Sequence, residues 1–187
     1  MESVDEKMKA HINRVIELSG GKEALNREVD ERLTAINRKW NQDIVSSGRI
    51  LRAHLFVEFY MTNFLLETTE GSLSKRQVER LTFAKKIDIS ENSQNTRIGV
   101  FIEGIRQLNR IRNQLAHNLS IQISHDALLP ILNTLEFTCL RNALAKPSSP
   151  STDPIDIIED FSKHAATIFD GETDPNSLGK RFNQAMR

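Results

Sequence analysis

Residues Ile98 to Asn118 read IGVFIEGIRQLNRIRNQLAHN, and this stretch decides the fold of the chain. At 100° per residue its apolar side chains fall on one stripe, which predicts a long amphipathic helix. The stripe consists of Ile98, Phe101, Ile102, Ile105, Leu108, Leu115 and Ala116. Arg112 lies on the same stripe, and burying a guanidinium is costly unless an anion meets it. Either a carboxylate such as Glu58 or Glu103 pairs with Arg112, or the stripe opens there into a cleft.

A histidine follows this arginine near the predicted end of the helix. His117 lies about a turn and a half beyond Arg112. At that position the negative end of the helix dipole favours an imidazolium. An arginine and a histidine at the mouth of an apolar groove therefore form the candidate functional site of this sequence.

The composition is typical of a helical protein with one sizeable core. The chain has 187 residues, and its 25 basic and 25 acidic residues cancel. This balance argues against a surface coated in positive charge for non-specific nucleic-acid binding. A single cysteine, Cys139, excludes an internal disulfide framework. No signal peptide begins the sequence and no apolar run reaches membrane length, so we expect a soluble cytoplasmic protein without a membrane partner.

The spacing of apolar residues predicts an all-α protein in four parts. We expect a helical hairpin over residues 1–45, a helical bundle over 46–146, a linker over 147–154 and an acidic helical tail over 155–187. Glycines 20 and 21 stop the first helix of the hairpin. Three prolines in the linker, Pro147, Pro150 and Pro154, predict that the tail helix is decoupled from the bundle.

Inside the bundle, the first long helix is expected to begin at Arg49, after a break at residues 46–48, and to end at Thr69. A capping box of Ser74 and Gln77 opens a shorter helix to about residue 86. A polar loop over residues 88–96 then leads to the helix that carries Arg112. A last helix of the bundle, capped by Ser124 or Asp126, is expected to run to about residue 145.

The helix over 49–69 has apolar residues on two sides, so it needs two packing partners. Ile50, Ala53, Val57, Tyr60, Met61 and Phe64 form one stripe, and Leu55, Phe59 and Leu66 form the other. One stripe covers the core of the subunit. We expect the other to meet a second copy of the chain, which predicts a homodimer.

Other kinds of site find little support in the sequence. The five histidines do not pair with one another at ligand spacing, and only His54 and Glu58 share a helix face, so we expect no metal and no cofactor. His54 is better explained as a core histidine that is hydrogen-bonded to a neighbour. Cys139 is expected to be a buried thiol. No phosphate-binding loop and no nucleophile elbow is present.

The segment LNRIRNQLAHN resembles the signature of the HEPN superfamily, which is an arginine, usually a polar residue, three more residues and a histidine. Arg112, Asn113 and His117 match this motif position by position. The resemblance extends over roughly residues 48–145, because GRILRAHLFVEFYMTNFLLE is similar to the first core helix of these domains and LTFAKKIDI to the segment before the motif helix. The toxin branch encoded beside nucleotidyltransferases often has a tyrosine two residues past the histidine, where this chain has Leu119.

The resemblance implies a HEPN-like helical bundle that dimerises with both motifs facing a shared cleft. It also implies a metal-independent endoribonuclease, with a toxin, defence or RNA-processing role and an antitoxin or other protein as a partner. Arg112, Asn113 and His117 would then be the catalytic residues. The competing interpretation is a non-catalytic helical dimer that acts as a regulator, scaffold or nucleotide- or RNA-binding module. A helix-turn-helix repressor ranks third, because no short glycine-containing turn joins two helices beside a basic face.

Overall fold

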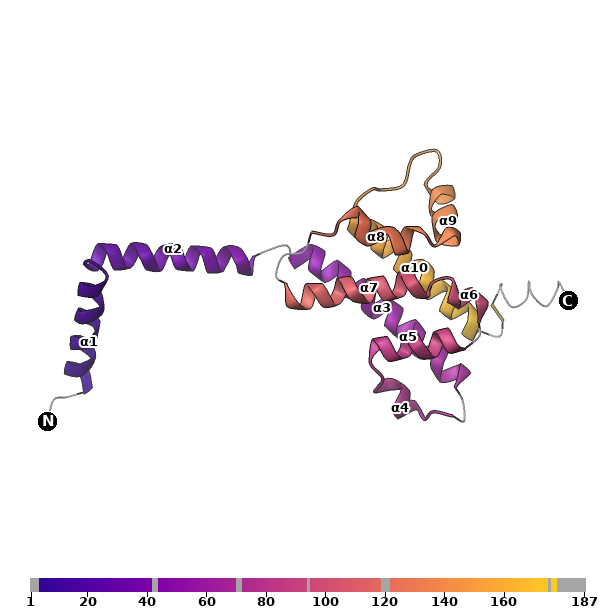
Figure 1. Cartoon of the computed structure of the whole chain (residues 1–187), viewed down its shortest axis with the longest axis horizontal. Helices are drawn as coiled ribbons and strands as arrows, with labels where there is room; N and C mark the ends of the chain where they lie inside the picture. Colours follow the sequence, from indigo (N-terminus) through magenta and orange to yellow (C-terminus); the bar gives the residue numbers. More distant parts are fainter. Residues whose placement is uncertain are drawn as a thin grey trace. The chain divides into compact units, whose positions relative to one another are not determined.

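The computed structural model of the chain describes residues 4–41, 44–69, 72–93, 95–118, 122–174 and 176–177. All regular structure in these ranges is helical, and they contain no strand, so the predicted all-α class is confirmed (Figure 1). The chain divides into two units, residues 1–42 and 43–187. Each unit is described by itself below.

The N-terminal unit consists of α1 (Val4–Leu18) and α2 (Lys22–Trp40). They are joined at Gly20 and Gly21, whose φ angles of 81° and 110° favour glycine, as the predicted helix stop requires. The predicted hairpin is wrong in its packing, because the two helices do not cover each other's apolar seams and none of their described side chains is buried. The exposed seam residues are Met8, Ile12, Val15, Leu18, Val29, Leu33, Ile36 and Trp40.

The second unit begins with α3 (Ile44–Thr68), and its described residues form seven further helices. They are α4 (Lys75–Glu79), α5 (Phe83–Asn92), α6 (Thr96–Gly99), α7 (Ile102–His117), α8 (His125–Leu132), α9 (Leu135–Ala145) and α10 (Pro154–Thr173). The predicted break at residues 46–48 is wrong, since α3 runs through it. A single glycine costs a helix only about 1 kcal/mol, and Ile50, Ala53 and Val57, which follow it, are buried against the core.

Three other boundaries differ from the sequence-based expectation. The last helix of the bundle, expected to run to about residue 145, is divided into α8 and α9 by a turn at residues 133–134. The capping box of Ser74 and Gln77 is confirmed, but α4 ends at Glu79 and Thr82 caps a new helix, α5. This helix occupies the first half of the predicted polar loop. The long helix expected from residue 98 is divided into α6 and α7 by a turn that keeps Ile98 and Phe101 buried.

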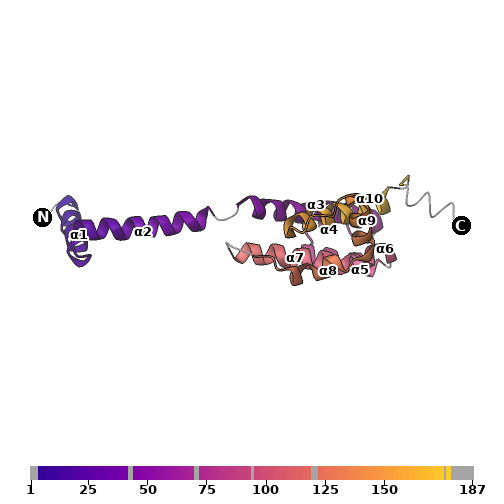
Figure 2. The ribbon, with the colours of Figure 1, turned by 90° about the horizontal axis from the view of Figure 1, so that it is seen from above.

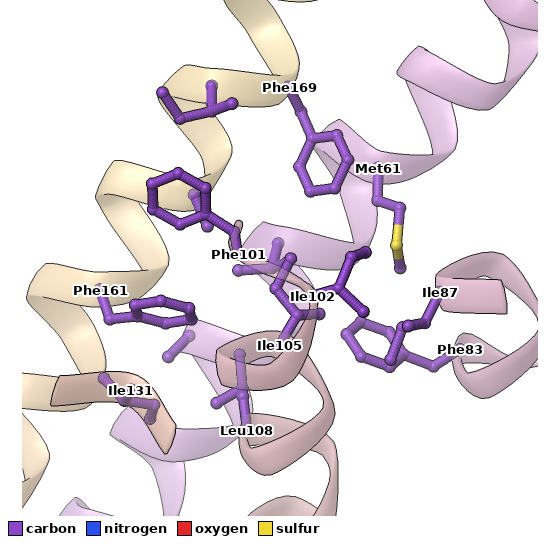
Figure 3. Close-up of a cluster of buried hydrophobic side chains, with 14 of the residues drawn as sticks. Met61, Phe83, Ile87, Phe101, Ile102, Ile105, Leu108, Ile131, Phe161 and Phe169 are labelled. Atoms are coloured by element: carbon purple, nitrogen blue, oxygen red, sulfur yellow. The ribbon is translucent and has the colours of Figure 1, made fainter. Parts of the chain in front are cut away.

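The core lies between two layers of helices. Figure 2 shows α3 and α10 side by side in one layer, with α5, α7 and α8 in the other. Large side chains from both layers meet between them and are fully buried (Figure 3). They include Met61, Phe64, Phe101, Ile105, Leu108, Phe161 and Phe169. This arrangement confirms most of the predicted core stripes of α3 and of the helix that carries Arg112, although Tyr60 and Leu115 are only half-buried and Ala116 is exposed.

The prediction that the tail helix is decoupled from the bundle is wrong, because α10 is a core element. Ile158 and Phe161 are completely buried, and Phe169 is 1% exposed. The ring of Phe161 lies against the backbone of α7, so close to Gly104 that a Cβ there would be 2.3 Å from the ring. Burial of one large apolar side chain contributes about 1.5–3 kcal/mol, which outweighs any freedom that the prolines give to the connection. Residues 178–187 of the predicted tail lie outside the described part of the chain.

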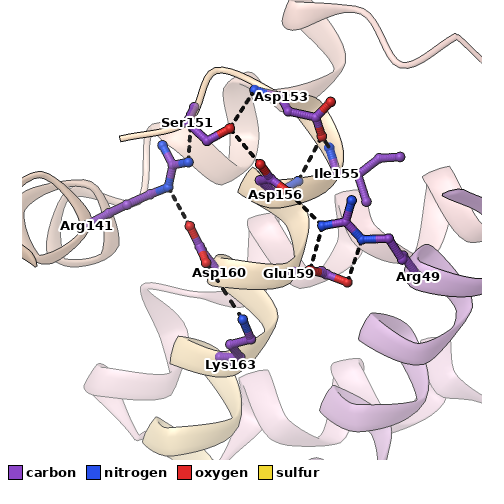
Figure 4. Close-up of polar contacts among 9 residues, drawn as sticks. All are labelled: Arg49, Arg141, Ser151, Asp153, Ile155, Asp156, Glu159, Asp160 and Lys163. Carbon is purple, nitrogen blue, oxygen red and sulfur yellow. Dashed lines mark hydrogen bonds and ion pairs between the residues drawn. The ribbon is translucent and has the colours of Figure 1, made fainter. Parts of the chain in front are cut away.

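Charged contacts also attach α10 to its neighbours (Figure 4). Arg49 of α3 forms ion pairs with Asp156 at 2.6 Å and with Glu159 at 2.8 Å. Arg141 of α9 donates to Asp160 at 3.0 Å. The acidic residues that the sequence assigned to a separate tail are therefore partners of arginines in the bundle.

Among the described helices, none combines the length and the apolarity needed to cross a membrane.

Candidate functional site

The three predicted site residues lie at the C-terminal end of α7, where the apolar face of this helix stops. Ile111 is buried, Arg112 is half-buried, and both Asn113 and His117 are exposed. The helix ends at His117, and the backbone N–H of Asn118 donates to the Gln114 carbonyl at 2.9 Å. The structure thus places the three side chains together at the surface, with the arginine nearest to the core.

The guanidinium of Arg112 is not tied to a carboxylate. Its Nη1 donates to Oδ1 of Asn113 at 3.1 Å, and within the described part of the chain it forms no ion pair. The two acids that the sequence offered as partners are engaged elsewhere. Glu58 pairs with Lys86 at 2.7 Å, and Glu103 lies 3.4 Å from Arg106. Of the two alternatives posed by the sequence, the structure therefore supports an arginine that is available to an external anion.

Beneath the motif lies a buried histidine on α3. His54 is 4% exposed, and its Nε2 lies 3.3 Å from Oδ1 of Asn109 on α7. Its ring packs against Phe83, with the ring centroids 3.9 Å apart. The predicted core histidine with a hydrogen-bonding neighbour is confirmed. Burial lowers the pKa of His54 below its ordinary value, so the ring is neutral near pH 7.

An ion pair between α3 and α5 lies on the same side of the core. The side chain of Lys86 is only 5% exposed, and its Nζ lies 2.7 Å from Oε1 of Glu58. The sequence did not predict this contact, because the two residues lie 28 positions apart on different helices. A pair this deeply buried ties two helices together, and breaking it by removing one partner leaves an uncompensated charge.

Positive charge is unevenly distributed along α7. Arg106 is engaged by the carboxylates of Asp88, Glu91 and Glu103. Arg110, one turn later, contacts only the amide oxygen of Gln107, at 3.1 Å. Like Arg112, it forms no ion pair with a described residue. The free positive charge of α7 is therefore concentrated in its C-terminal half, beside His117.

Other features do not converge on the site. No group of three or more potential metal-binding side chains occurs among the described residues. Cys139 is exposed on α9, so the predicted buried thiol is wrong. A cavity of about 600 Å³ lies between α9 and α10, lined in part by Phe137, Arg141 and His164. None of the three motif residues lines it.

Comparison of the chain with protein-family models, curated proteins and solved structures finds no match in any of the three. The chemistry of the site therefore has to be judged from its own residues. Arg112 can bind an oxyanion through two parallel N–H groups. The imidazole of His117 can serve as a general acid or base. Asn113, which already accepts a hydrogen bond from Arg112, can orient that guanidinium.

Proposed function

We propose that this chain is a metal-independent endoribonuclease of the HEPN type. RNA carries its own nucleophile, the 2′-OH, so cleavage needs a proton acceptor, a proton donor and a cation near the phosphate. His117 moves protons, Arg112 neutralises the charge that develops on the phosphate oxygens, and Asn113 orients Arg112. A toxin, defence or RNA-processing role is compatible with this activity.

The observation that supports the proposal most strongly is the unpaired guanidinium of Arg112. A structural arginine on an apolar helix face is normally compensated by a carboxylate. Here Glu58 and Glu103 bind other cations, and among the described residues the only side-chain partner of Arg112 is the amide of Asn113. An anion-binding group therefore stands next to an exposed imidazole, at the end of α7 where the free positive charge lies.

The proposed enzyme acts as a homodimer. A single chain supplies one His117, whereas general acid and general base catalysis in one step needs two proton-transfer groups. The outer face of α3 supports pairing, because Leu51, Leu55, Phe56 and Phe59 are between 41% and 60% exposed. These residues, with Gly48 and Arg52, line a shallow groove of about 430 Å³. Symmetric association over such a face would bring two motifs into one assembly.

The test is cleavage of single-stranded RNA by the purified protein in the presence of EDTA. We expect His117→Ala to lower the rate by about 10²–10⁴ and Arg112→Ala by about 10²–10³. Arg112→Lys should recover little, because an ammonium cannot make the planar two-pronged contact. A substrate without 2′-OH groups should not be cleaved. The matched controls are His11→Ala and Arg76→Ala, which remove an exposed histidine on α1 and an exposed arginine on α4.

The stability of the same variants separates this proposal from the alternative, a non-catalytic regulator or scaffold. That alternative is favoured by the exposed apolar seams of α1 and α2, which are suited to binding another protein. If Arg112 were a structural tie to a buried carboxylate, its truncation would cost about 3–5 kcal/mol. We expect Arg112→Ala to melt at nearly the parent temperature. A large loss of stability, with no RNA cleavage by the parent protein, would establish the scaffold instead.

A further inference from the structure

The side chain of Asn109 lies near the motif but takes no part in the proposed reaction. Asn109 lies on α7, is half-buried, and connects the interior to the surface. On the interior side, its Oδ1 lies 3.3 Å from Nε2 of His54. Its Nδ2 makes no hydrogen bond with a described residue, so two N–H groups remain available on the outer side.

The state of His54 determines which end of the amide faces outward. A neutral imidazole carries one N–H, and an amide oxygen only accepts, so the contact with Asn109 requires the proton on Nε2. The other ring nitrogen, Nδ1, is buried without a hydrogen-bond partner among the described residues. If the amide were reversed, its NH₂ would donate to Nε2, and the single proton of the neutral ring would lie on Nδ1. That N–H would be buried without an acceptor, which is rare in proteins. His54 therefore holds the oxygen of Asn109 inward and its NH₂ outward.

The geometry of the helix places this NH₂ among the motif residues. Asn109 precedes Arg112 by three residues and Asn113 by four, so it shares a face with both. Asn113 in turn precedes His117 by four. Arg112, Asn109, Asn113 and His117 thus follow one another around α7 within an arc of roughly 140°. Asn109 stands between the arginine and the histidine, on the surface that a bound phosphate would cover.

We propose that Asn109 is a fourth residue of the site, which donates from Nδ2 to a phosphate oxygen of bound RNA, and that His54 is a positioning residue that fixes its orientation. This inference rests on the proposed ribonuclease function. A phosphate is the ligand that the position favours, since an outward NH₂ offers only donors and lies in the field of Arg112. A base edge would need donors and acceptors together.

The experiment measures the affinity of a fluorescein-labelled single-stranded RNA in a His117→Ala background, in which the RNA stays intact. Asn109→Asp keeps the acceptor for His54 and removes the donors. We expect it to weaken binding by about 10- to 100-fold, the range for losing a hydrogen bond to a charged group. Asn109→Leu, which adds no charge, should also weaken binding. The matched control is Asn142→Asp, the same replacement at an exposed position of α9, which should bind within about threefold of its parent.

The outcomes distinguish this inference from the proposed function. If Arg112→Ala abolishes RNA binding while Asn109→Asp binds as well as Asn142→Asp, the role of Asn109 is refuted and the proposed function stands. If the parent protein binds no RNA and Arg112→Ala changes nothing, both fail. Thermal melts of each variant show whether it is folded.

The positioning role of His54 has a readout that does not depend on activity. Nitrogen-15 NMR of the histidine rings reports which nitrogen carries the proton. We expect a neutral His54 with its proton on Nε2 in the parent and in Asn109→Asp, and a mixture of the two tautomers in Asn109→Leu. A proton on Nδ1 in the parent would overturn the assignment, because the amide would then present its oxygen to the RNA.

Discussion

At the scale of single residues, two buried histidines make stability depend on pH. Burial lowers the pKa of both His54 and His164 below the ordinary value of 6.5, against the opposing effects of Glu58 and Glu136. The unfolded chain therefore takes up protons near pH 6.5 while the folded chain stays neutral. Because the unfolded state then binds more protons, the free energy of unfolding falls as the pH drops below about 6.5.

We expect the melting temperature, followed by circular dichroism, to decrease from pH 7 to about pH 5. His164→Gln should reduce this slope, whereas His125→Gln, at an exposed position, should not. The carboxylates affect the stability of the fold in a separate, more acidic pH range. Hydrogen bonds from Ser151 and then Arg49 lower the pKa of Asp156, so its contribution is lost only below its ordinary value of 3.8. An unchanged melting temperature between pH 7 and pH 5 would show that neither histidine is desolvated as described.

The sequence predicts the identity of the motif residues better than their surroundings. The spacing of Arg112, Asn113 and His117 within one amphipathic helix was sufficient to place them together. Their neighbours come from other helices, and periodicity gives no information about which helix packs where. For this reason the sequence left open whether Arg112 pairs with a carboxylate such as Glu58 or Glu103 or faces a cleft. Asn109 had a signal, as a polar residue three positions before Arg112, but its contact with His54 spans 55 residues of chain.

At the scale of helices, the close contact between α7 and α10 requires glycine, which has no side chain, at position 104. In an ordinary helix, Gly→Ala is favourable by about 1 kcal/mol. At Gly104 the new Cβ would lie 2.3 Å from the ring of Phe161, and overpacking of a core costs about 1–3 kcal/mol. We expect Gly104→Ala to lower the free energy of unfolding in urea. Gly171→Ala on α10, where no atom lies within 4 Å, should leave it unchanged or raise it.

A second replacement tests whether the loss comes from this contact. Phe161→Leu shortens the side chain that faces Gly104 and should itself be destabilising, since Phe161 is fully buried. In the double variant we expect Gly104→Ala to cost less than it does in the parent, because the clash is relieved. If the losses of the two single variants simply add in the double variant, the destabilisation by Gly104→Ala does not come from its contact with Phe161.

Removal of α10 tests its place in the core. A chain ending at Lys146 lacks every buried residue of this helix, among them Ile158, Phe161 and Phe169. It also leaves Arg49 without both of its carboxylate partners. We expect this shortened chain to lose its cooperative thermal transition, whereas a chain ending at Asp174, which keeps α10, should retain it. A cooperative melt of the shorter chain would show that the remaining helices fold without α10.

The sequence predicted the helices of most segments, but it assigned residues 88–92 to a loop and did not give every boundary or partner. Apolar periodicity identifies helices because it reflects burial on one face. The boundaries of a helix depend both on local residues such as glycine and on the burial of its apolar side chains. In α3, burial of the core face stabilises the helix by more than Gly48 destabilises it. The role of α10 was misjudged for a related reason. Prolines 147, 150 and 154 affect only the conformation of the segment before α10. Whether α10 packs on the bundle depends on the apolar face of α10 itself.

At the scale of the whole molecule, charge and exposed apolar surface determine what the protein can associate with. The net charge is zero, yet local pairing leaves α7 with free positive charge only near the motif. Balanced composition therefore does not exclude a small anion-binding site. Composition also does not show which apolar residues stay exposed, because that depends on which face of α3 the core covers. The two stripes of this helix predicted an outer face, and the structure places Leu55 and Phe59 there, 54% and 60% exposed.

The last prediction is that pairing through this face is needed for activity. We expect light scattering at micromolar concentration to give the mass of a dimer. Leu55→Glu and Phe59→Glu should yield folded monomers, because both side chains point away from the core and burial of a carboxylate in an apolar interface is strongly unfavourable. Leu135→Glu, at a 72% exposed position on α9, should remain a dimer.

Loss of RNA cleavage should accompany the loss of the dimer. A folded Leu55→Glu monomer that keeps His117 and Arg112 would have only one proton-transfer group within reach of a given phosphate. His117→Ala, by contrast, should remain a dimer and be inactive, so the two kinds of variant separate assembly from chemistry. Full activity in a Leu55→Glu monomer would show that one chain contains the complete site. A parent protein that is monomeric at micromolar concentration would remove the shared site from the mechanism and leave His117 to act alone.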